Sequence, residues 1–232
     1  MTDLGKNTNP SAGQRLESID RELLERILAC GRQMLRDGLV LGTAGNISVR
    51  VPSGVVITPS SVPYDEIAIE DLCLLDIEGE QVDGRGRPSA ETPMHLSIYR
   101  EAGAGAIVHT HSPMAVSVST VVDELPAIHY AIAQLGGEDV RVAAYERFGS
   151  DALAGATLAA LAGRSAALLR NHGTVAYGSS LDRAYHRARL LEWLCDVYWR
   201  ARAIGEPTIL SGEQLDEVVA EAQRRRYGTV TG

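Results

Sequence analysis

The sequence is almost devoid of lysine. Among its 232 residues Lys6 is the single lysine, and the other strongly basic side chains are all arginine. An amine of lysine is what forms a Schiff base with a carbonyl substrate, and Lys6 stands in a polar stretch near the start of the chain. Covalent carbonyl chemistry through lysine is therefore not expected. If this protein activates a carbonyl group, it must do so with a metal ion.

Cysteine is scarce, and long hydrophobic runs are missing. Cys30, Cys73 and Cys195 form no CxxC pair, so we interpret them as reduced thiols of a cytoplasmic protein. No leader or membrane-spanning run is evident, since the most apolar stretch, residues 152–169, is rich in alanine and glycine and contains Arg164. The net charge is −8, so neither nucleic acid nor a membrane is expected as a partner.

The hydrophobic periodicity predicts one α/β domain over residues 14–232, after a disordered tail over 1–13. Helical spacing predicts helices over residues 16–38, 91–102, 113–120, 150–162, 181–204 and 212–226. Short apolar or alternating runs predict strands over residues 43–50, 55–58, 72–77, 106–108, 166–170 and 175–177, with another near Ile128. Ser89 is expected to cap the helix that begins at Glu91.

The segment Ala106-Ile-Val-His109-Thr-His111-Ser-Pro113 carries the clearest chemical signal. Side chains at i and i+2 of an extended chain point to the same face, so His109 and His111 should lie side by side where a buried strand ends. His172 also follows an apolar run. Three neutral imidazoles leave a divalent metal with its full positive charge and an open position, as a Lewis acid needs. The alternative is a set of hydrogen-bonded core histidines.

Glu91 stands at the start of a predicted helix and admits two interpretations. Its carboxylate can interact with the helix dipole. It can also act as a general base or an additional ligand beside a metal, where it would remove the proton next to a polarised carbonyl. The remaining histidines, His95, His129 and His186, are expected to be structural. Trp193 and Trp199 are expected to serve the core or a subunit contact.

Three loops combine glycine, hydroxyl side chains and a helix start. They are Gly42-Thr-Ala-Gly-Asn46-Ile-Ser48, Thr58-Pro-Ser60-Ser61 and Ser89-Ala90. Backbone N–H groups in tight turns bind anions, as do helix N-termini. Each loop is also explained by ordinary turn chemistry, but together they favour a phosphate-binding site.

Six short motifs, taken in order, resemble the class II aldolase/adducin head family. They are Gly42-Thr-Ala-Gly-Asn-Ile-Ser-Val-Arg50, Thr58-Pro-Ser60, Pro88-Ser-Ala-Glu91, Val108-His-Thr-His111, Pro126-Ala-Ile-His-Tyr130 and Asn171-His-Gly173. The resemblance spans residues 16–228 and is greatest to members that cleave L-fuculose 1-phosphate. It implies a three-layer α/β/α fold around a mostly antiparallel central sheet. It also implies a homotetramer with active sites at subunit interfaces.

The resemblance implies a role for each matching residue. His109, His111 and His172 match the histidines that bind one zinc ion per chain. Glu91 matches the acid/base carboxylate, which also coordinates that zinc. Tyr130 matches a tyrosine that donates a proton in a neighbouring subunit's site. The positions that match substrate- and phosphate-binding residues are Gly45, Asn46, Ser60, Ser61, Ser89, Ala90 and Tyr227.

The implied activity is zinc-dependent cleavage of a small sugar phosphate. The substrate would be a ketose 1-phosphate, either L-fuculose 1-phosphate or a related deoxy-pentulose 1-phosphate, and the products dihydroxyacetone phosphate and an aldehyde. Two departures weaken the phosphate site. Ser60-Ser61 stands where the fuculose-cleaving members have Thr-Gly, and Ala90 replaces a serine.

Three alternatives stay open at this point. The string Pro88-Ser-Ala-Glu-Thr92 also resembles methylthioribulose-1-phosphate dehydratase, which shares the fold and the metal site. A decarboxylase of a sugar-acid phosphate would use the same site. A non-catalytic interaction module, as in adducin heads, is disfavoured because the three histidines and Glu91 are all present. A pentulose-phosphate epimerase is disfavoured because such members carry aspartate at the position of Glu91.

Overall fold

A computed structural model describes residues 15–226 of the chain. Within them, nine strands form one sheet in the order β4-β3-β2-β1-β5-β9-β8-β7-β6. Every neighbouring pair is antiparallel except β7 and β8. The strands are β1 Asn46–Val51, β2 Gly54–Ile57, β3 Cys73–Leu75, β4 Gln81–Asp83, β5 Ala106–Thr110, β6 Glu124–Pro126, β7 Asp139–Ala143, β8 Ala166–Leu169 and β9 Gly173–Gly178. The predicted mostly antiparallel sheet is confirmed.

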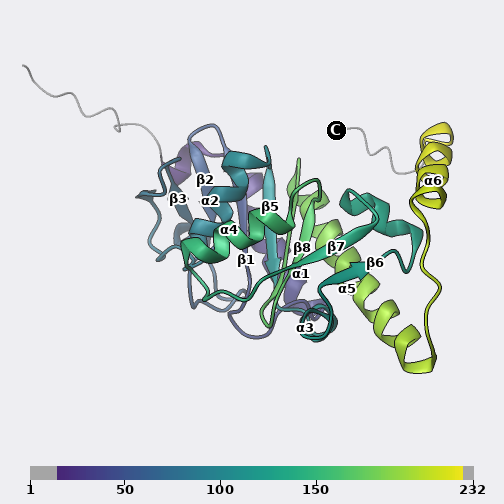
Figure 1. Cartoon of the computed structure of the whole chain (residues 1–232). Helices are drawn as coiled ribbons and strands as arrows, with labels where there is room; N and C mark the ends of the chain where they lie inside the picture. Colours follow the sequence, from purple (N-terminus) through teal and green to yellow (C-terminus); the bar gives the residue numbers. More distant parts are fainter. Residues whose placement is uncertain (1–14, 227–232) are drawn as a thin grey trace, which may run out of the picture.

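Helices cover both faces of this sheet, so the predicted three-layer α/β/α architecture is also confirmed (Figure 1). On one face α1, α3 and α5 share a core cluster, and on the other α2 and α4 share a second cluster. The helices are α1 Arg21–Arg36, α2 Thr92–Glu101, α3 Pro113–Ser119, α4 Asp151–Ala160, α5 Leu181–Ile204 and α6 Gly212–Arg224. Short 3-10 turns are η1 Leu16–Ser18, η2 Ile69–Asp71 and η3 Tyr130–Leu135.

The structure differs from the local expectations in three ways. The strand expected near Ile128 forms slightly earlier, as the edge strand β6 that ends at Pro126, and the chain at Ile128 leads into η3. The strands β4 and β7 were not expected. Ser89 is not the cap of α2: that position is held by Glu91, and the Ser89 hydroxyl accepts a hydrogen bond from the Glu91 amide.

Some expectations lie outside the described residues, namely the tail over 1–13 and Tyr227. Among residues 15–226, no helix is both long enough and apolar enough to cross a membrane.

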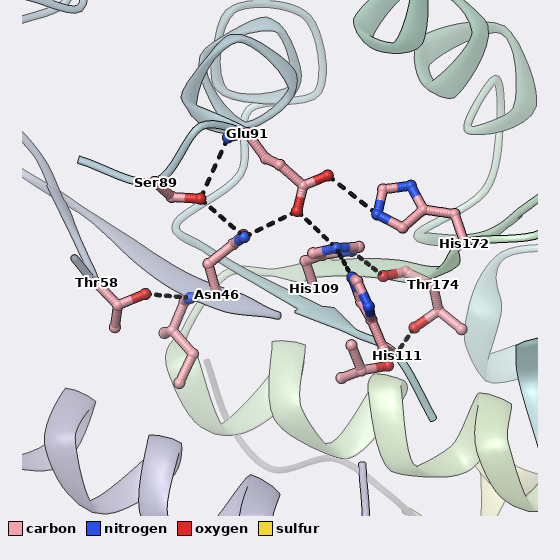
Figure 2. Close-up of polar contacts among 10 residues, drawn as sticks. Asn46, Thr58, Ser89, Glu91, His109, His111, His172 and Thr174 are labelled. Atoms are coloured by element: carbon pink, nitrogen blue, oxygen red, sulfur yellow. Dashed lines mark hydrogen bonds and ion pairs between the residues drawn. The ribbon is translucent and has the colours of Figure 1, made fainter. Parts of the chain in front are cut away.

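The register of three central strands decides where the site forms. Asn46 at the start of β1 pairs with His109 near the end of β5, and Thr110 at that end pairs with Thr174 at the start of β9. These strand ends therefore lie at the same edge of the sheet. The loop that carries His172 immediately precedes β9, and the α2 N-terminus lies above the same edge (Figure 2).

Candidate metal centre and substrate pocket

Four side chains that the sequence singled out converge at this edge: Glu91, His109, His111 and His172. One ligand atom from each lies within 4.8 Å of the others. Figure 2 shows the Glu91 carboxylate facing the imidazoles from the start of α2. The residues come from α2, from the end of β5 and from the loop before β9, which are far apart in sequence. The predicted convergence is thus present in the structure.

His109 is oriented as a metal-binding imidazole. Its Nδ1 atom donates a hydrogen bond to the carbonyl oxygen of Thr174 at 2.7 Å, because a carbonyl can only accept. Nε2 then faces the cluster, 2.8 Å from Oε2 of Glu91 and 2.9 Å from Nε2 of His111. An imidazole whose second nitrogen is tied to a backbone carbonyl is the usual arrangement of a histidine ligand.

The Glu91 carboxylate is buried, and Asn46 contacts it in addition to the imidazoles. Oε2 accepts a hydrogen bond from the Asn46 amide at 3.0 Å, and that amide also contacts the Ser89 hydroxyl at 3.0 Å. Oε1 lies 3.2 Å from Nε2 of His172 without the geometry of a hydrogen bond. A buried carboxylate oxygen without a hydrogen bond needs an explanation. A metal ion among three imidazoles supplies one, and a donor set of nitrogen with one carboxylate suits zinc.

The charges of the cluster act strongly on one another. Burial raises the pKa of Glu91, but the imidazoles of His109 and His172 outweigh burial and hold it well below its ordinary value. Burial lowers the pKa of His109, yet the Glu91 carboxylate outweighs this and raises it. Burial, together with His109 and His172, lowers the pKa of His111 to about 3. A proton between His109 and Glu91 therefore competes with any cation that binds there.

A pocket of about 390 Å³ opens beside this cluster. Its lining contains most of the residues predicted to bind substrate or metal, which are Gly45, Asn46, Ser60, Ser61, Ser89, Ala90, Glu91, His111 and His172. His109 lies behind them and is fully buried. The hydroxyl and glycine loops thus line the same pocket as the candidate metal ligands.

The pocket also contains residues that the sequence did not reveal. Tyr145, Glu146 and Phe148 reach it from the loop after β7. Thr43, Ala44, Pro59 and Asn171 also line the pocket, and all four stand in the motifs that resemble the family. Nothing in the sequence pointed to Tyr145 or Phe148, because their place depends on how β7 pairs within the sheet.

Two pocket residues adopt a left-handed backbone conformation that side chains other than glycine rarely take. The φ angles are +64° at Ser61 and +56° at Asn171. Such conformations cost free energy and cluster at functional sites. In Asn171 the conformation immediately precedes His172 and helps to set the direction in which that imidazole leaves the chain.

Tyr130 is not in the lining of this pocket. It is 52% exposed at the start of η3, where its ring lies 4.3 Å from that of His129. His129 in turn packs against Trp193. Trp193 and Trp199 are both exposed, so they are not core residues. The expectation that Tyr130 serves a neighbouring subunit stays a prediction, as does the subunit contact of the tryptophans.

Comparison with known proteins places the chain among enzymes. The family model of the class II aldolase and adducin N-terminal domain matches residues 25–199. A 5-deoxy-D-ribulose 1-phosphate aldolase of Bacillus thuringiensis is 39% identical over 84% of this chain and 92% of that protein. A 5-methylthioribulose-1-phosphate/5-deoxyribulose-1-phosphate aldolase of Rhodospirillum rubrum is 39% identical over 83% and 87%. A solved L-fuculose 1-phosphate aldolase matches with a TM-score of 0.84 and 34% identity over 89% and 98%.

Proposed function

The chain belongs to the class II aldolase and adducin N-terminal domain family, and from this premise we propose that it is a zinc-dependent ketose-1-phosphate aldolase. The observation that carries the proposal is the convergence of Glu91 with three imidazoles at the wall of a pocket that hydroxyl and glycine loops also line. A non-catalytic module would have no need of this buried, charged cluster.

His109, His111 and His172 would hold the metal ion, which supplies Lewis-acid polarisation of the substrate's carbonyl group. In the direction of synthesis, Glu91 takes a proton from the carbon next to the carbonyl of dihydroxyacetone phosphate. The electron pair left on that carbon forms the new bond to the aldehyde's carbonyl carbon. Tyr130 of the partner subunit donates its phenolic proton to the resulting alkoxide, and cleavage is the reverse sequence.

The phosphate group would lie against the loops of Gly45, Ser60, Ser61 and Ser89. Their hydroxyls and backbone N–H groups are neutral donors suited to an anion. Ala90 offers only its backbone, so one hydroxyl is lost there. Asn46 offers its carbonyl oxygen rather than its amide nitrogen, because the nitrogen already faces Ser89 and Glu91. Asn46 is therefore better suited to accept a hydrogen bond from a substrate hydroxyl.

The substrate we favour is a 5-deoxypentulose 1-phosphate. The two relatives that are 39% identical carry names of this kind. Tyr145 and Phe148 are 65% and 60% exposed, and they give the pocket an aromatic side. Such a side suits a methyl or methylthio end better than a hydroxylated one.

The test is a coupled assay of dihydroxyacetone phosphate release from the zinc-loaded protein. The substrates are 5-deoxyribulose 1-phosphate, 5-methylthioribulose 1-phosphate and L-fuculose 1-phosphate, each with and without a chelator. We expect chelator-sensitive release, fastest with one of the two 5-substituted ribulose phosphates. Consumption of substrate without this product would contradict the aldolase and indicate the dehydratase, and release of carbon dioxide from a sugar-acid phosphate would indicate the decarboxylase.

A further inference from the structure

The face of β1 that looks toward α2 carries a row of polar side chains. Asn46, Ser48 and Arg50 alternate along the strand and therefore share one face. Two residues of a strand rise about 6.6 Å, and four residues of a helix rise about 6 Å. Every second residue of a strand can therefore face every fourth residue of a helix that packs along it. Positions 91, 95 and 99 at α2 have this second spacing, and they also carry polar side chains.

Each polar residue of β1 meets its counterpart at α2. Asn46 donates to the Glu91 carboxylate at 3.0 Å. The Ser48 hydroxyl lies 2.6 Å from Nδ1 of His95 and 2.8 Å from the hydroxyl of Tyr99. Arg50 donates to the backbone carbonyl of Tyr99, and its guanidinium lies 4.9 Å from the centre of the Tyr99 ring. We call the contacts of these three β1 residues with α2 the β1–α2 ladder, and the contact of Ser48 with His95 and Tyr99 is its middle contact.

The middle contact of the ladder is sealed from water. Ser48 and His95 are fully buried, and Tyr99 is nearly so. Burial lowers the pKa of His95 to about 3, so this imidazole is neutral. A hydrogen bond in such surroundings has no water to replace it when one partner is removed.

The direction of the two buried hydrogen bonds of Ser48 follows from how many polar groups each arrangement leaves without a partner. If Tyr99 donates to Ser48 and Ser48 donates to Nδ1 of His95, one group, Nε2–H of His95, is left without a partner. The reverse direction leaves two such groups, the Tyr99 O–H and the Nε2 lone pair. The first arrangement is favoured, since each unpaired buried polar group costs free energy. His95 is then held in one tautomer and one ring orientation.

We propose that the β1–α2 ladder sets the position of the Glu91 carboxylate, with Ser48 and His95 as positioning residues. A ladder that keeps the helix in step with the strand fixes how far α2 can slide along β1. Glu91 lies at the end of that helix nearest the imidazoles. This inference rests on the proposed function, in which Glu91 transfers the proton.

The test compares the S48A, H95F and H95N variants with I98V, all loaded with zinc. S48A removes both hydrogen bonds of the middle contact with little change of volume, and H95F keeps a ring but no polar atom. H95N keeps a polar atom near the place of Nδ1. Ile98 is fully buried on the same helix but outside the ladder, so I98V shows what loss of packing alone does. Melting temperatures are measured for all four.

We expect kcat to fall about 10–100-fold in S48A and H95F, as positioning residues around metal sites typically show. KM should stay within about threefold, because ground-state binding is retained. H95N should recover part of the loss, and I98V should stay near the wild type. A kcat in S48A equal to that of the wild type would overturn the proposal. A fall in kcat that tracks the fall in melting temperature in the same way in all four variants would also overturn it.

A second readout does not depend on turnover. The zinc dissociation constant, measured by competition with a coloured chelator, should rise about tenfold in S48A and H95F and remain unchanged in I98V, because Glu91 is also a proposed ligand. If the wild type cleaves no ketose phosphate, the proposed function fails, and the zinc dissociation constant alone then tests whether the ladder positions Glu91. Equal zinc affinity in S48A, H95F and the wild type would overturn the proposal that it does.

Discussion

At the scale of single residues, the position of Glu91 brings several requirements together. Its carboxylate must be buried to act on a substrate out of water, yet it must stay charged to accept a proton. Burial alone would raise its pKa, and the imidazoles of His109 and His172 reverse that effect. The Asn46 amide supplies a donor to the same carboxylate. Each of these neighbours therefore keeps the carboxylate ionised, which is the form that can accept a proton.

Replacing Glu91 by glutamine tests this role. E91Q keeps the size of the side chain but cannot accept the proton, so kcat should fall about 10²–10⁴-fold, the range of general acid–base catalysis. Glu101, exposed at the end of the same helix, gives the matched control E101Q, which should keep its rate. Steady-state release of dihydroxyacetone phosphate measures both. A fall of less than tenfold in E91Q would contradict the assignment.

The residues of the metal cluster could be predicted because their signal is local. His109 and His111 are two positions apart beside a strand, and this spacing alone places them together. The role of Asn46 could not be predicted in the same way. Its side chain was expected to bind substrate, and its direct contact with Glu91 depends on the packing of α2 over β1.

At the scale of elements, the junction between β5 and β9 brings His172 to the other imidazoles. A Cβ atom added at Gly173 would lie 2.0 Å from the carbonyl oxygen of Thr110 and 3.2 Å from Cδ2 of His111. Only glycine lets the two strands approach so closely at the edge where the cluster forms.

The variant G173A should therefore lose about 1–3 kcal/mol of stability, as overpacked sites do, and it should bind zinc more weakly. Gly155 provides a control at which the same substitution should raise stability instead of lowering it. It is exposed within α4 with no atom within 4 Å of an added Cβ, so G155A should be more stable by about 1 kcal/mol. Urea unfolding measures both. Equal stability of G173A and the wild type would contradict this prediction, because it would show that β5 and β9 can move apart for the added methyl group at no cost.

A second junction links the end of α1 to α5 and predicts a pH dependence of stability. Burial raises the pKa of Asp37, but the hydrogen bonds from Tyr185 and Gln33 and the charge of Arg189 outweigh burial and lower it. A carboxylate with a lowered pKa stabilises the fold above its unfolded pKa of about 3.9, and this contribution is lost as the pH falls through the folded value.

At pH 7 the variant D37N should consequently be less stable than the wild type by about 1–2 kcal/mol. The difference should stay constant down to about pH 5 and narrow below about pH 4. Urea unfolding at several pH values measures it. A difference that is the same at every pH would show that the charge of Asp37 contributes nothing.

The elements differ in how well the sequence predicts them. The bounds of α5 were predicted as they are observed, because 24 residues of helical spacing lie between Ser180, whose hydroxyl accepts from the Arg183 amide, and Gly205. The strand β7 was missed, although its residues alternate. It is held by parallel pairing with β8 and antiparallel pairing with β6, which are contacts that local spacing does not report.

At the scale of the whole molecule, several aromatic side chains lie on the surface rather than in the core. Tyr130, Trp193 and Trp199 are all exposed, with Tyr130 and Trp193 both packed on the ring of His129. Figure 1 shows α6 on the side of the sheet where β6 lies, and α6 packs on η3, the turn that begins at Tyr130. We expect these surfaces to be covered in a homotetramer. Light scattering should give the mass of a tetramer, and the mass of a single chain would contradict this expectation.

The proposed chemistry requires that Glu91, His109, His111 and His172 form a metal centre. The most direct test of this claim is to supply zinc to the purified protein, remove the excess metal, and measure the metal content of the protein by elemental mass spectrometry. We predict about one zinc ion per chain, the stoichiometry of a mononuclear catalytic site. In the H111A/H172A double variant that content should be lost while the fold is retained. A wild-type protein that binds no metal, or a double variant that binds as much as the wild type, would contradict the claim.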